Sequence, residues 1–198
     1  MKLYINTTSP FVRPVRIAIE EKGLADKIAL EIVDPWGDPP EFLKANGAGR
    51  VPALVTDDGH AIAESALILR YLDEIAAPSI FPAGDLAETL SIAAPAVGAI
   101  DAAVAIIISR KSAPGFDNDM VGTKRHRTMA EGLARLNARL PRDFADRPDI
   151  ANIAAVTAID YILFRFTDRD WLADLPALRA WRERQSGRPS VDRTMPYV

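Results

Sequence analysis

Two adjacent polar residues, Glu64 and Ser65, stand where an extended stretch gives way to a helical pattern. A serine at a helix N-terminus can present its hydroxyl and its backbone N–H to a carboxylate, and the helix dipole favours that negative charge. The preceding glutamate can accept an ammonium group. The alternative interpretation is that both residues only start the helix, because serine is a common N-cap. The pair is therefore a candidate binding site for a molecule that carries both a carboxylate and an ammonium group.

Other chemistry finds little support in the sequence. There is no cysteine, which excludes disulfides, thiolate metal sites and a mixed disulfide between the protein and a thiol ligand. His60 and His126 have no partner at the spacing of a metal site or a catalytic triad, so we expect both to face solvent and the basic run 124–127 to be a solvated face. We find no phosphate-binding loop, paired-carboxylate motif or Ser-His-Asp arrangement, and we expect no metal.

The elements that position Glu64 and Ser65 follow a mixed α and β order. Alternating apolar residues predict strands, a Ser-Pro pair predicts a helix start, and Asp57-Asp58-Gly59 is typical of a hairpin turn. The proline at position 52 must begin its strand or lie at an edge, since it has no N–H to donate. The expected elements are a strand at 2–6, a helix at 10–22, a strand at 28–33, a short helix at 41–45, a hairpin after Val51-Pro52 and a helix at 64–75. This β-α-β then β-β-α order is that of a thioredoxin-like domain.

After residue 84 the strand patterns stop. Prolines and a glycine in residues 76–84 indicate a linker, and long helical patterns follow it. We expect helices at 85–110, bent near Pro95, around the apolar stripe of residues 129–140, at 149–166 as the buried central helix, at 175–185 and at 190–195. The predicted fold class is α/β plus all-α: an N-terminal thioredoxin-like domain over 1–76, a linker over 77–84 and an all-helical C-terminal domain over 85–198.

Composition limits the class of partner. The chain has 198 residues, 48% of them hydrophobic, and a net charge of −3, so it can bury a sizeable core and gives no electrostatic case for nucleic acid or an anionic membrane. The apolar stretch 92–108 contains Pro95, Gly98 and Asp101, so we expect a buried helix there instead of a membrane span. The first five residues run into a strand pattern with no charged leader, so we expect a cytoplasmic protein.

The segment Val51-Pro52-Ala53-Leu54, followed at this distance by Glu64-Ser65 and a helix, resembles the glutathione-binding half of the glutathione transferase superfamily. The resemblance implies that Pro52 is cis and that Val51 offers its N–H and C=O to the cysteinyl part of glutathione, as an added strand would. It also implies that Glu64 and Ser65 bind the γ-glutamyl end. Arg50 falls where many family members have a lysine beside the glycyl carboxylate.

Three further features bear on this resemblance. Arg13 is a second candidate for a glutathione carboxylate or for ordering the site, and Trp36 is expected to border it. Asn46-Gly47 departs from the family's common Asn-Pro.

Residues 9–13, Ser-Pro-Phe-Val-Arg, resemble the stretch where bacterial-type, serine-like family members place the active hydroxyl. Ser9 is thus the first candidate for donating an O–H to the glutathione thiolate, with Thr8 and Thr7 as alternatives. Lowering a thiol pKa by about two units requires roughly 2.7 kcal/mol, within reach of one charge-assisted hydrogen bond and a helix dipole. The rival role for Ser9 is that of a helix cap alone, and the two roles are compatible because a cap uses an oxygen lone pair.

The resemblance implies a homodimeric glutathione transferase that acts in detoxification. Glutathione would be the co-substrate, and its thiol would be conjugated to a small hydrophobic electrophile. The alternatives are a glutathione-dependent isomerase or dehalogenase, or a non-catalytic binding protein of the same fold.

Overall fold

The chain divides into two units in a computed structural model that describes all residues from 1 to 198. Unit 1 contains Met1–Ile80 and Pro189–Val198, and unit 2 contains Phe81–Arg188. The sequence division assigned residues 189–198 to the helical domain, whereas their contacts place them in unit 1. The reason is that α8 (Pro189–Asp192) packs against α1 (Val12–Glu21). Residues 189–198 are called the C-terminal segment below.

A four-stranded sheet forms the centre of unit 1. Its strands are β1 (Lys2–Ile5), β2 (Ala29–Ile32), β3 (Ala53–Val55) and β4 (Ala61–Ala63), in the spatial order β2-β1-β3-β4. β1 and β2 are parallel, while β3 runs antiparallel to β1 and to β4. This arrangement confirms the predicted thioredoxin-like order, with a parallel first half and an antiparallel second half.

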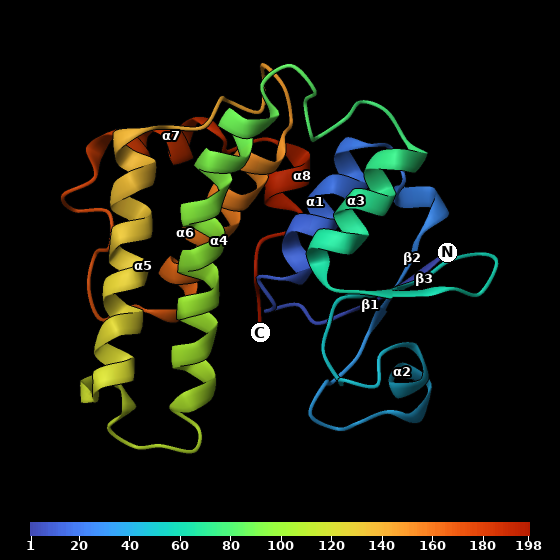
Figure 1. Cartoon of the computed structure of the whole chain (residues 1–198), viewed down its shortest axis with the longest axis horizontal. Coiled ribbons are helices and arrows are strands. Elements are labelled where there is room, and N and C mark those ends of the chain that lie inside the picture. Colours follow the sequence, from blue (N-terminus) through green and yellow to red (C-terminus); the bar gives the residue numbers. More distant parts are fainter. The chain divides into compact units, whose positions relative to one another are not determined.

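Helices cover both faces of this sheet (Figure 1). α1 and α3 (Ser65–Ile75) lie together on one face, and α2 (Pro40–Ala45) lies on the other. Side chains alternate along a strand, so Leu3 and Tyr4 of β1 face opposite layers. Tyr4 packs with Phe42 of α2, their ring centroids 5.5 Å apart, in a small core with Val33 and Ala53. A single-turn 3₁₀ helix, η1 (Ala25–Lys27), precedes β2.

A buried ion pair joins α1 to α3. Lys22 Nζ lies 2.8 Å from Asp73 Oδ1, and the two side chains are 0% and 5% exposed. The ammonium also donates to the carbonyls of Ala76 and Pro78, while Asp73 accepts from the N–H of Ile80. Burial by itself raises the pKa of Asp73, but these hydrogen bonds outweigh it and hold the pKa below its usual value. The pair therefore fixes the end of α3 and the start of the linker.

Unit 2 is helical. It contains α4 (Leu86–Ser109), a 3₁₀ turn η2 (Phe116–Asn118), α5 (Met120–Ala138), α6 (Ile150–Arg165) and α7 (Pro176–Arg184). α4 packs against both α5 and α6. Every residue of α6 from Ile150 to Ile162 is buried, which confirms it as the central helix.

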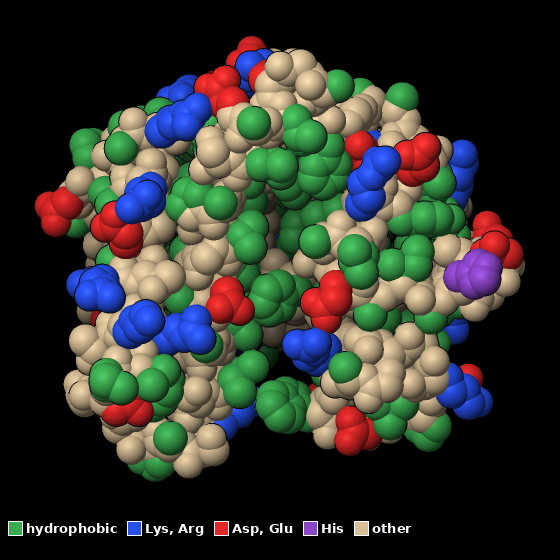
Figure 2. Space-filling view, in the orientation of Figure 1, with side chains coloured by type: hydrophobic (Ala, Val, Ile, Leu, Met, Phe, Trp, Pro, Cys, Tyr) green, Lys and Arg blue, Asp and Glu red, His purple; other side chains and the backbone are tan.

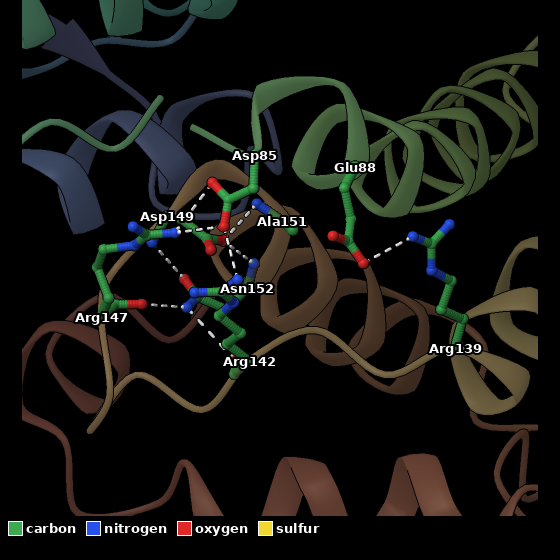
Figure 3. A network of polar contacts seen from close by, with 8 residues as sticks. All are labelled: Asp85, Glu88, Arg139, Arg142, Arg147, Asp149, Ala151 and Asn152. Atoms are coloured by element: carbon green, nitrogen blue, oxygen red, sulfur yellow. Dashed lines mark hydrogen bonds and ion pairs between the residues drawn. The ribbon is translucent and has the colours of Figure 1, made fainter. Parts of the chain in front are cut away.

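The start of α6 is fixed by polar contacts (Figure 3). Asp149 accepts from the N–H of Asn152, and Asn152 Oδ1 accepts from the N–H of Asp149, so the two residues form a capping box. Asn152 also donates to the carbonyl of Arg147, and Arg147 and Arg142 both pair with Asp85 at the N-cap of α4. The network therefore ties the beginnings of two helices to the loop that joins α5 and α6.

α4 and α5 approach most closely at Gly132. A Cβ on this residue would lie 2.6 Å from the carbonyl oxygen of Pro95 and 2.8 Å from Cβ of Ala99. No side chain fits at that separation, so the glycine is required for the helix crossing.

The apolar helix α4 differs from its prediction. Its length and composition alone would allow it to span a membrane, but the core helices of soluble proteins meet the same criteria. Its face towards the other helices is buried, but Leu90 and Val97 are 43% and 51% exposed. The prediction of a buried helix is thus correct for one face only.

Candidate functional site

The segment that leads into β3 leaves a backbone edge open. The Val51-Pro52 peptide bond is cis, Pro52 is buried and Val51 is half-buried. β3 begins to pair with β1 only at Ala53, and neither the N–H nor the C=O of Val51 has a hydrogen-bond partner. An extended, peptide-like ligand can use both groups as a neighbouring strand would.

The start of α3 lies next to this segment because Ala53 pairs with Ala63 in the β3–β4 hairpin, and it carries an unusual backbone. Glu64, the N-cap of α3, has φ 68° and ψ 123°, a conformation that costs a non-glycine residue about 1–3 kcal/mol. The half-buried Ser65 follows, and its hydroxyl makes no hydrogen bond within the protein. Because the first N–H groups of a helix have no intrahelical acceptor, Ser65 presents an N–H and an O–H to a ligand.

Arg50 and Glu64 contact each other directly. Arg50 Nη2 lies 2.9 Å from Glu64 Oε1, and the two side chains are 71% and 60% exposed. The sequence assigned them to opposite ends of the ligand and did not predict the pair. A cation and an anion thus stand side by side next to Val51, and both remain accessible to a charged ligand.

Asn46 shapes the loop that carries Arg50, a role that sequence reasoning missed. Its side chain donates to the carbonyl of Arg50 at 2.6 Å and accepts from the N–H of Ala48 at 3.1 Å. An asparagine that bonds the backbone two residues on is typical of a tight turn, so Asn-Gly was the available signal. Asn46 therefore fixes the turn that leads to Arg50.

Ser9 acts as a helix cap in this structure. Its Oγ accepts from the N–H groups of Phe11 and Val12 at 3.3 and 3.4 Å, while its own hydroxyl hydrogen has no acceptor within the protein. The hydroxyl of Thr8 instead donates to Asn6 Oδ1 at 2.7 Å. Thr7 is half-buried and its side chain makes no hydrogen bond. Ser9 therefore caps the helix while its hydroxyl proton remains available to a ligand. The hydroxyl proton of Thr8 is already used in the hydrogen bond to Asn6.

Arg13 does not face a ligand. It is 3% exposed, and its guanidinium donates to the carbonyl of Val191 at 3.2 Å and to Thr194 Oγ1 at 3.4 Å. The prediction that Arg13 binds a glutathione carboxylate is wrong, because the C-terminal segment uses this side chain. Trp36, the other residue expected near the site, is 67% exposed.

The two histidines differ from each other. His60 is exposed as predicted, 3.5 Å from Asp58. His126 is partly buried, binds Asp117 at 2.7 Å and stacks on Trp171 with ring centroids 6.5 Å apart. The prediction that His126 faces solvent is therefore wrong, since the side chain is partly buried and Asp117 reaches it from η2.

Comparisons with known proteins decide the family. Residues 8–75 match the model of the glutathione S-transferase N-terminal domain, and residues 119–184 match that of the C-terminal domain. An uncharacterized GST-like protein, YibF of Escherichia coli, is 30% identical over 99% of this chain and 98% of its own length. The chain belongs to the glutathione S-transferase family.

Solved structures agree across the whole chain. A glutathione transferase family member from Pseudomonas fluorescens, crystallised with bound glutathione, has a TM-score of 0.89 and 31% identity and covers 100% of this chain and 99% of its own. A glutathione S-transferase from Methylobacterium radiotolerans, in complex with glutathione sulfonate, has a TM-score of 0.88 and 29% identity over 100% of this chain and 95% of its own. The N-terminal model spans Ser9, Arg50, Val51 and Glu64, so the family match includes the candidate site of this transferase.

Proposed function

We propose that this glutathione S-transferase family member binds glutathione in unit 1 and activates its thiol for conjugation to a hydrophobic electrophile. The observation that carries the proposal is the open backbone edge at Val51, next to charged groups of both signs and the exposed N-terminus of α3. Two structural neighbours with bound glutathione or a glutathione derivative support it.

Each part of glutathione meets a group of suitable chemistry. The γ-glutamyl carboxylate accepts from the N–H and O–H of Ser65, and Glu64 takes the neighbouring ammonium. Val51 pairs with the backbone of the cysteinyl residue, and Arg50 binds the glycyl carboxylate. On binding, Arg50 pairs with the glycyl carboxylate and Glu64 with the ammonium group. Each side chain thus exchanges its present partner for an oppositely charged group of the ligand.

The thiol of the bound ligand is stabilised as a thiolate by Ser9. Its hydroxyl donates to the sulfur, and the N-terminus of α1 contributes a positive potential. The thiolate attacks the electrophilic carbon, a C–S bond forms, and either the leaving group departs or the carbon–carbon double bond of the electrophile takes a proton. Lowering the thiol pKa raises the fraction of this nucleophile at neutral pH.

Calorimetric titration of glutathione at two pH values around the thiol pKa tests the proposal. Binding with proton release is expected, since the bound form is the thiolate. Conjugation is then followed by mass spectrometry of the product with chlorodinitrobenzene. Absence of glutathione binding to the folded protein would refute the proposed function and favour a binding protein for other ligands.

An isomerase reaction is the second candidate. The maleylacetoacetate isomerase of Pseudomonas aeruginosa is 28% identical over 84% of this chain and 82% of its own length. Isomerisation returns glutathione unchanged, whereas conjugation consumes it. Measuring thiol consumption alongside substrate conversion therefore separates these reactions.

We further propose that the protein is a cytoplasmic homodimer that acts in detoxification. Exposed apolar side chains support association, among them Leu67 on α3 and Val97 on α4, which are 61% and 51% exposed. The cytosol supplies reduced glutathione, which supports that compartment. Light scattering at several concentrations tests the dimer, and fractionation of the source cells tests the location. Growth of a deletion strain with added electrophiles tests the role in detoxification.

A further inference from the structure

The loop between β1 and α1 is fixed by hydrogen bonds to one residue, Asn6. Its Oδ1 accepts from the backbone N–H of Thr8 at 3.0 Å and from the Thr8 hydroxyl at 2.7 Å, and its carbonyl accepts from the N–H of Ser9 at 3.3 Å. The side-chain contact to the residue two positions on is an Asx turn, and the carbonyl contact closes a β-turn over residues 6–9. No hydrogen bond joins Thr7 or Thr8 to another element. Asn6 therefore sets the path of the chain up to Ser9.

Regular structure holds the two ends of this loop. The carbonyl of Ile5, at the end of β1, accepts from the N–H of Val33 at 2.9 Å, and β1 lies between β2 and β3 in the sheet. At the other end the carbonyl of Ser9 accepts from the N–H of Arg13 at 3.2 Å, which is the hydrogen-bond spacing of an α-helix. The hydrogen bonds to Asn6 are therefore the connection between a fixed strand and a fixed helix.

This turn places the Ser9 hydroxyl. The N–H of Ser9 is held by Asn6, and its Oγ accepts from the N–H groups of Phe11 and Val12 at 3.3 and 3.4 Å. Ser9 is thus held on both sides, by the turn before it and by the helix after it. A hydroxyl that is held in advance stabilises a negative charge better than one that must first be ordered.

We propose that Asn6 is a positioning residue for Ser9 and sets how strongly the Ser9 hydroxyl stabilises the glutathione thiolate. This inference rests on the proposed function, because it takes Ser9 as the donor to the sulfur. Asn6 acts through Ser9 and not by contact with the ligand. Without the Asx turn the loop takes up other conformations, and the Ser9 hydroxyl is directed at the sulfur for less of the time. The pKa of the bound thiol then rises, while the groups that bind the rest of glutathione stay in place.

A direct contact between Asn6 and the sulfur is the alternative. The side chain is half-buried, and its amide nitrogen makes no hydrogen bond within the protein, so two N–H donors are open to a ligand. A double-mutant cycle with Ser9 separates the two roles. If Asn6 acts through Ser9, replacing it has no further effect once the Ser9 hydroxyl is gone. A direct donor would have the same effect with or without that hydroxyl.

The cycle is measured on the pKa of the thiol of bound glutathione, read from the ultraviolet absorbance of the thiolate. We expect Asn6→Ala to raise this pKa by about one unit, which lowers the thiolate fraction about tenfold at a pH below both values. Ser9→Ala and the double variant should have the same thiol pKa. The Kd for S-methylglutathione, which has no thiol to ionise, should stay at the wild-type value in Asn6→Ala.

Asn46→Ala is the matched control, because Asn46 forms the same kind of turn in the loop that carries Arg50. Its Oδ1 accepts from the N–H of Ala48 at 3.1 Å, and its amide donates to the carbonyl of Arg50 at 2.6 Å. Asn46→Ala should weaken binding of S-methylglutathione and leave the pKa of the bound glutathione thiol unchanged. This is the opposite pattern to that expected for Asn6→Ala, so a general loss of order in unit 1 would not imitate it.

Two further variants test the turn itself. Asn6→Ser has a hydroxyl that forms the same turn more weakly, so it should restore part of the wild-type thiol pKa. Asn6→Gln keeps the amide, but its oxygen is one methylene farther from the backbone and does not close the turn, so it should behave as Asn6→Ala does. If Asn6→Ala does not fold, these two variants supply the comparison.

The outcomes separate this inference from the proposed function. Hydrogen exchange without ligand should be faster at the amides of Thr8 and Ser9 in Asn6→Ala than in the wild type, and equal rates would overturn the inference. If the wild type binds glutathione but Asn6→Ala leaves the thiol pKa unchanged, or if the double variant differs from Ser9→Ala, the inference alone fails. If the folded wild type binds no glutathione, the proposed function fails and the inference with it.

Discussion

Arg50 and Glu64 form an ion pair across fourteen residues of sequence, at the edge of the proposed glutathione site. Both side chains are mostly exposed, so the pair contributes little to folding stability. In the proposed site each charge has a counterpart on glutathione, the glycyl carboxylate for Arg50 and the ammonium group for Glu64.

Arg50→Met should leave the thermal midpoint unchanged and weaken glutathione binding about tenfold, because the glycyl carboxylate loses its cation. The salt dependence of Kd should fall as well. Titrations at two ionic strengths measure both effects, with Arg70→Met as the control, since Arg70 is 64% exposed against 71% for Arg50 and pairs with Glu74 on α3. Equal affinity for Arg50→Met and wild type would exclude Arg50 from the site.

Ser65→Ala should weaken glutathione affinity about tenfold with little change in kcat, because a hydrogen bond to a charged carboxylate is lost in the ground state and the transition state alike. The Kd from calorimetry and the kcat from the conjugation assay are compared. Unchanged affinity would contradict the proposed γ-glutamyl contact.

Ser9→Ala should lower kcat and raise the pKa of the bound thiol, with only a modest loss of affinity. Removing the cap also costs stability, by about 1 kcal/mol. Ser9→Asn keeps a side-chain oxygen that can cap the helix but has no hydroxyl, so it separates the two effects. The thiol pKa is read from the ultraviolet absorbance of the thiolate in the binary complex. A wild-type thiol pKa in Ser9→Ala would leave Ser9 as a cap only.

Lys22→Met should destabilise unit 1 by about 3–5 kcal/mol at neutral pH, because Asp73 is left buried without its cation. The depressed pKa of Asp73 adds stability above the unfolded carboxyl pKa of about 3.9, and this stability is lost as the pH falls through the lower folded value. Urea unfolding at pH values above and below that range should show the difference between wild type and variant shrinking in acid. Lys44→Met, which removes an exposed pair with Glu41, should unfold as wild type does.

Gly132→Ala should destabilise unit 2 by about 1–3 kcal/mol, since the new methyl group meets the carbonyl of Pro95. Gly98→Ala, on the facing helix, adds a Cβ with no atom within 4 Å and should be neutral or stabilising by about 0.5–1 kcal/mol. Denaturant midpoints of the two variants give the comparison. Similar destabilisation by both would contradict the close crossing at Gly132.

Local patterns were sufficient to predict the elements of unit 1 and the core helix of unit 2. The strands, the Ser-Pro helix start and the Asp149–Asn152 cap each depend on residues within a few positions of one another. Contacts across long separations could not be predicted this way. Lys22 meets Asp73, and Asp117 reaches His126 from a 3₁₀ turn, only because the packed helices bring them together.

The same limit applies to the candidate site. The sequence predicted Val51, Glu64 and Ser65 as site residues from a short motif, yet it missed the direct pairing of Arg50 with Glu64 and the turn held by Asn46. It also proposed Arg13 as a candidate for binding a glutathione carboxylate. An arginine near a helix start gives no sign that residues nearly 180 positions later in the chain will bury it.

The return of the C-terminal segment to α1 has a consequence for synthesis on the ribosome. Residues 1–80 emerge first, but the hydrogen bonds that Arg13 makes to Val191 and Thr194 wait until all of unit 2 has been translated. Until then the Arg13 guanidinium, which is buried in the folded protein, remains hydrated, and the face of α1 around it remains exposed to solvent. A nascent chain arrested before residue 189 should therefore be cleaved by protease near α1 more readily than the protein that contains residues 189–198, so unit 1 is completed only after unit 2 has been translated.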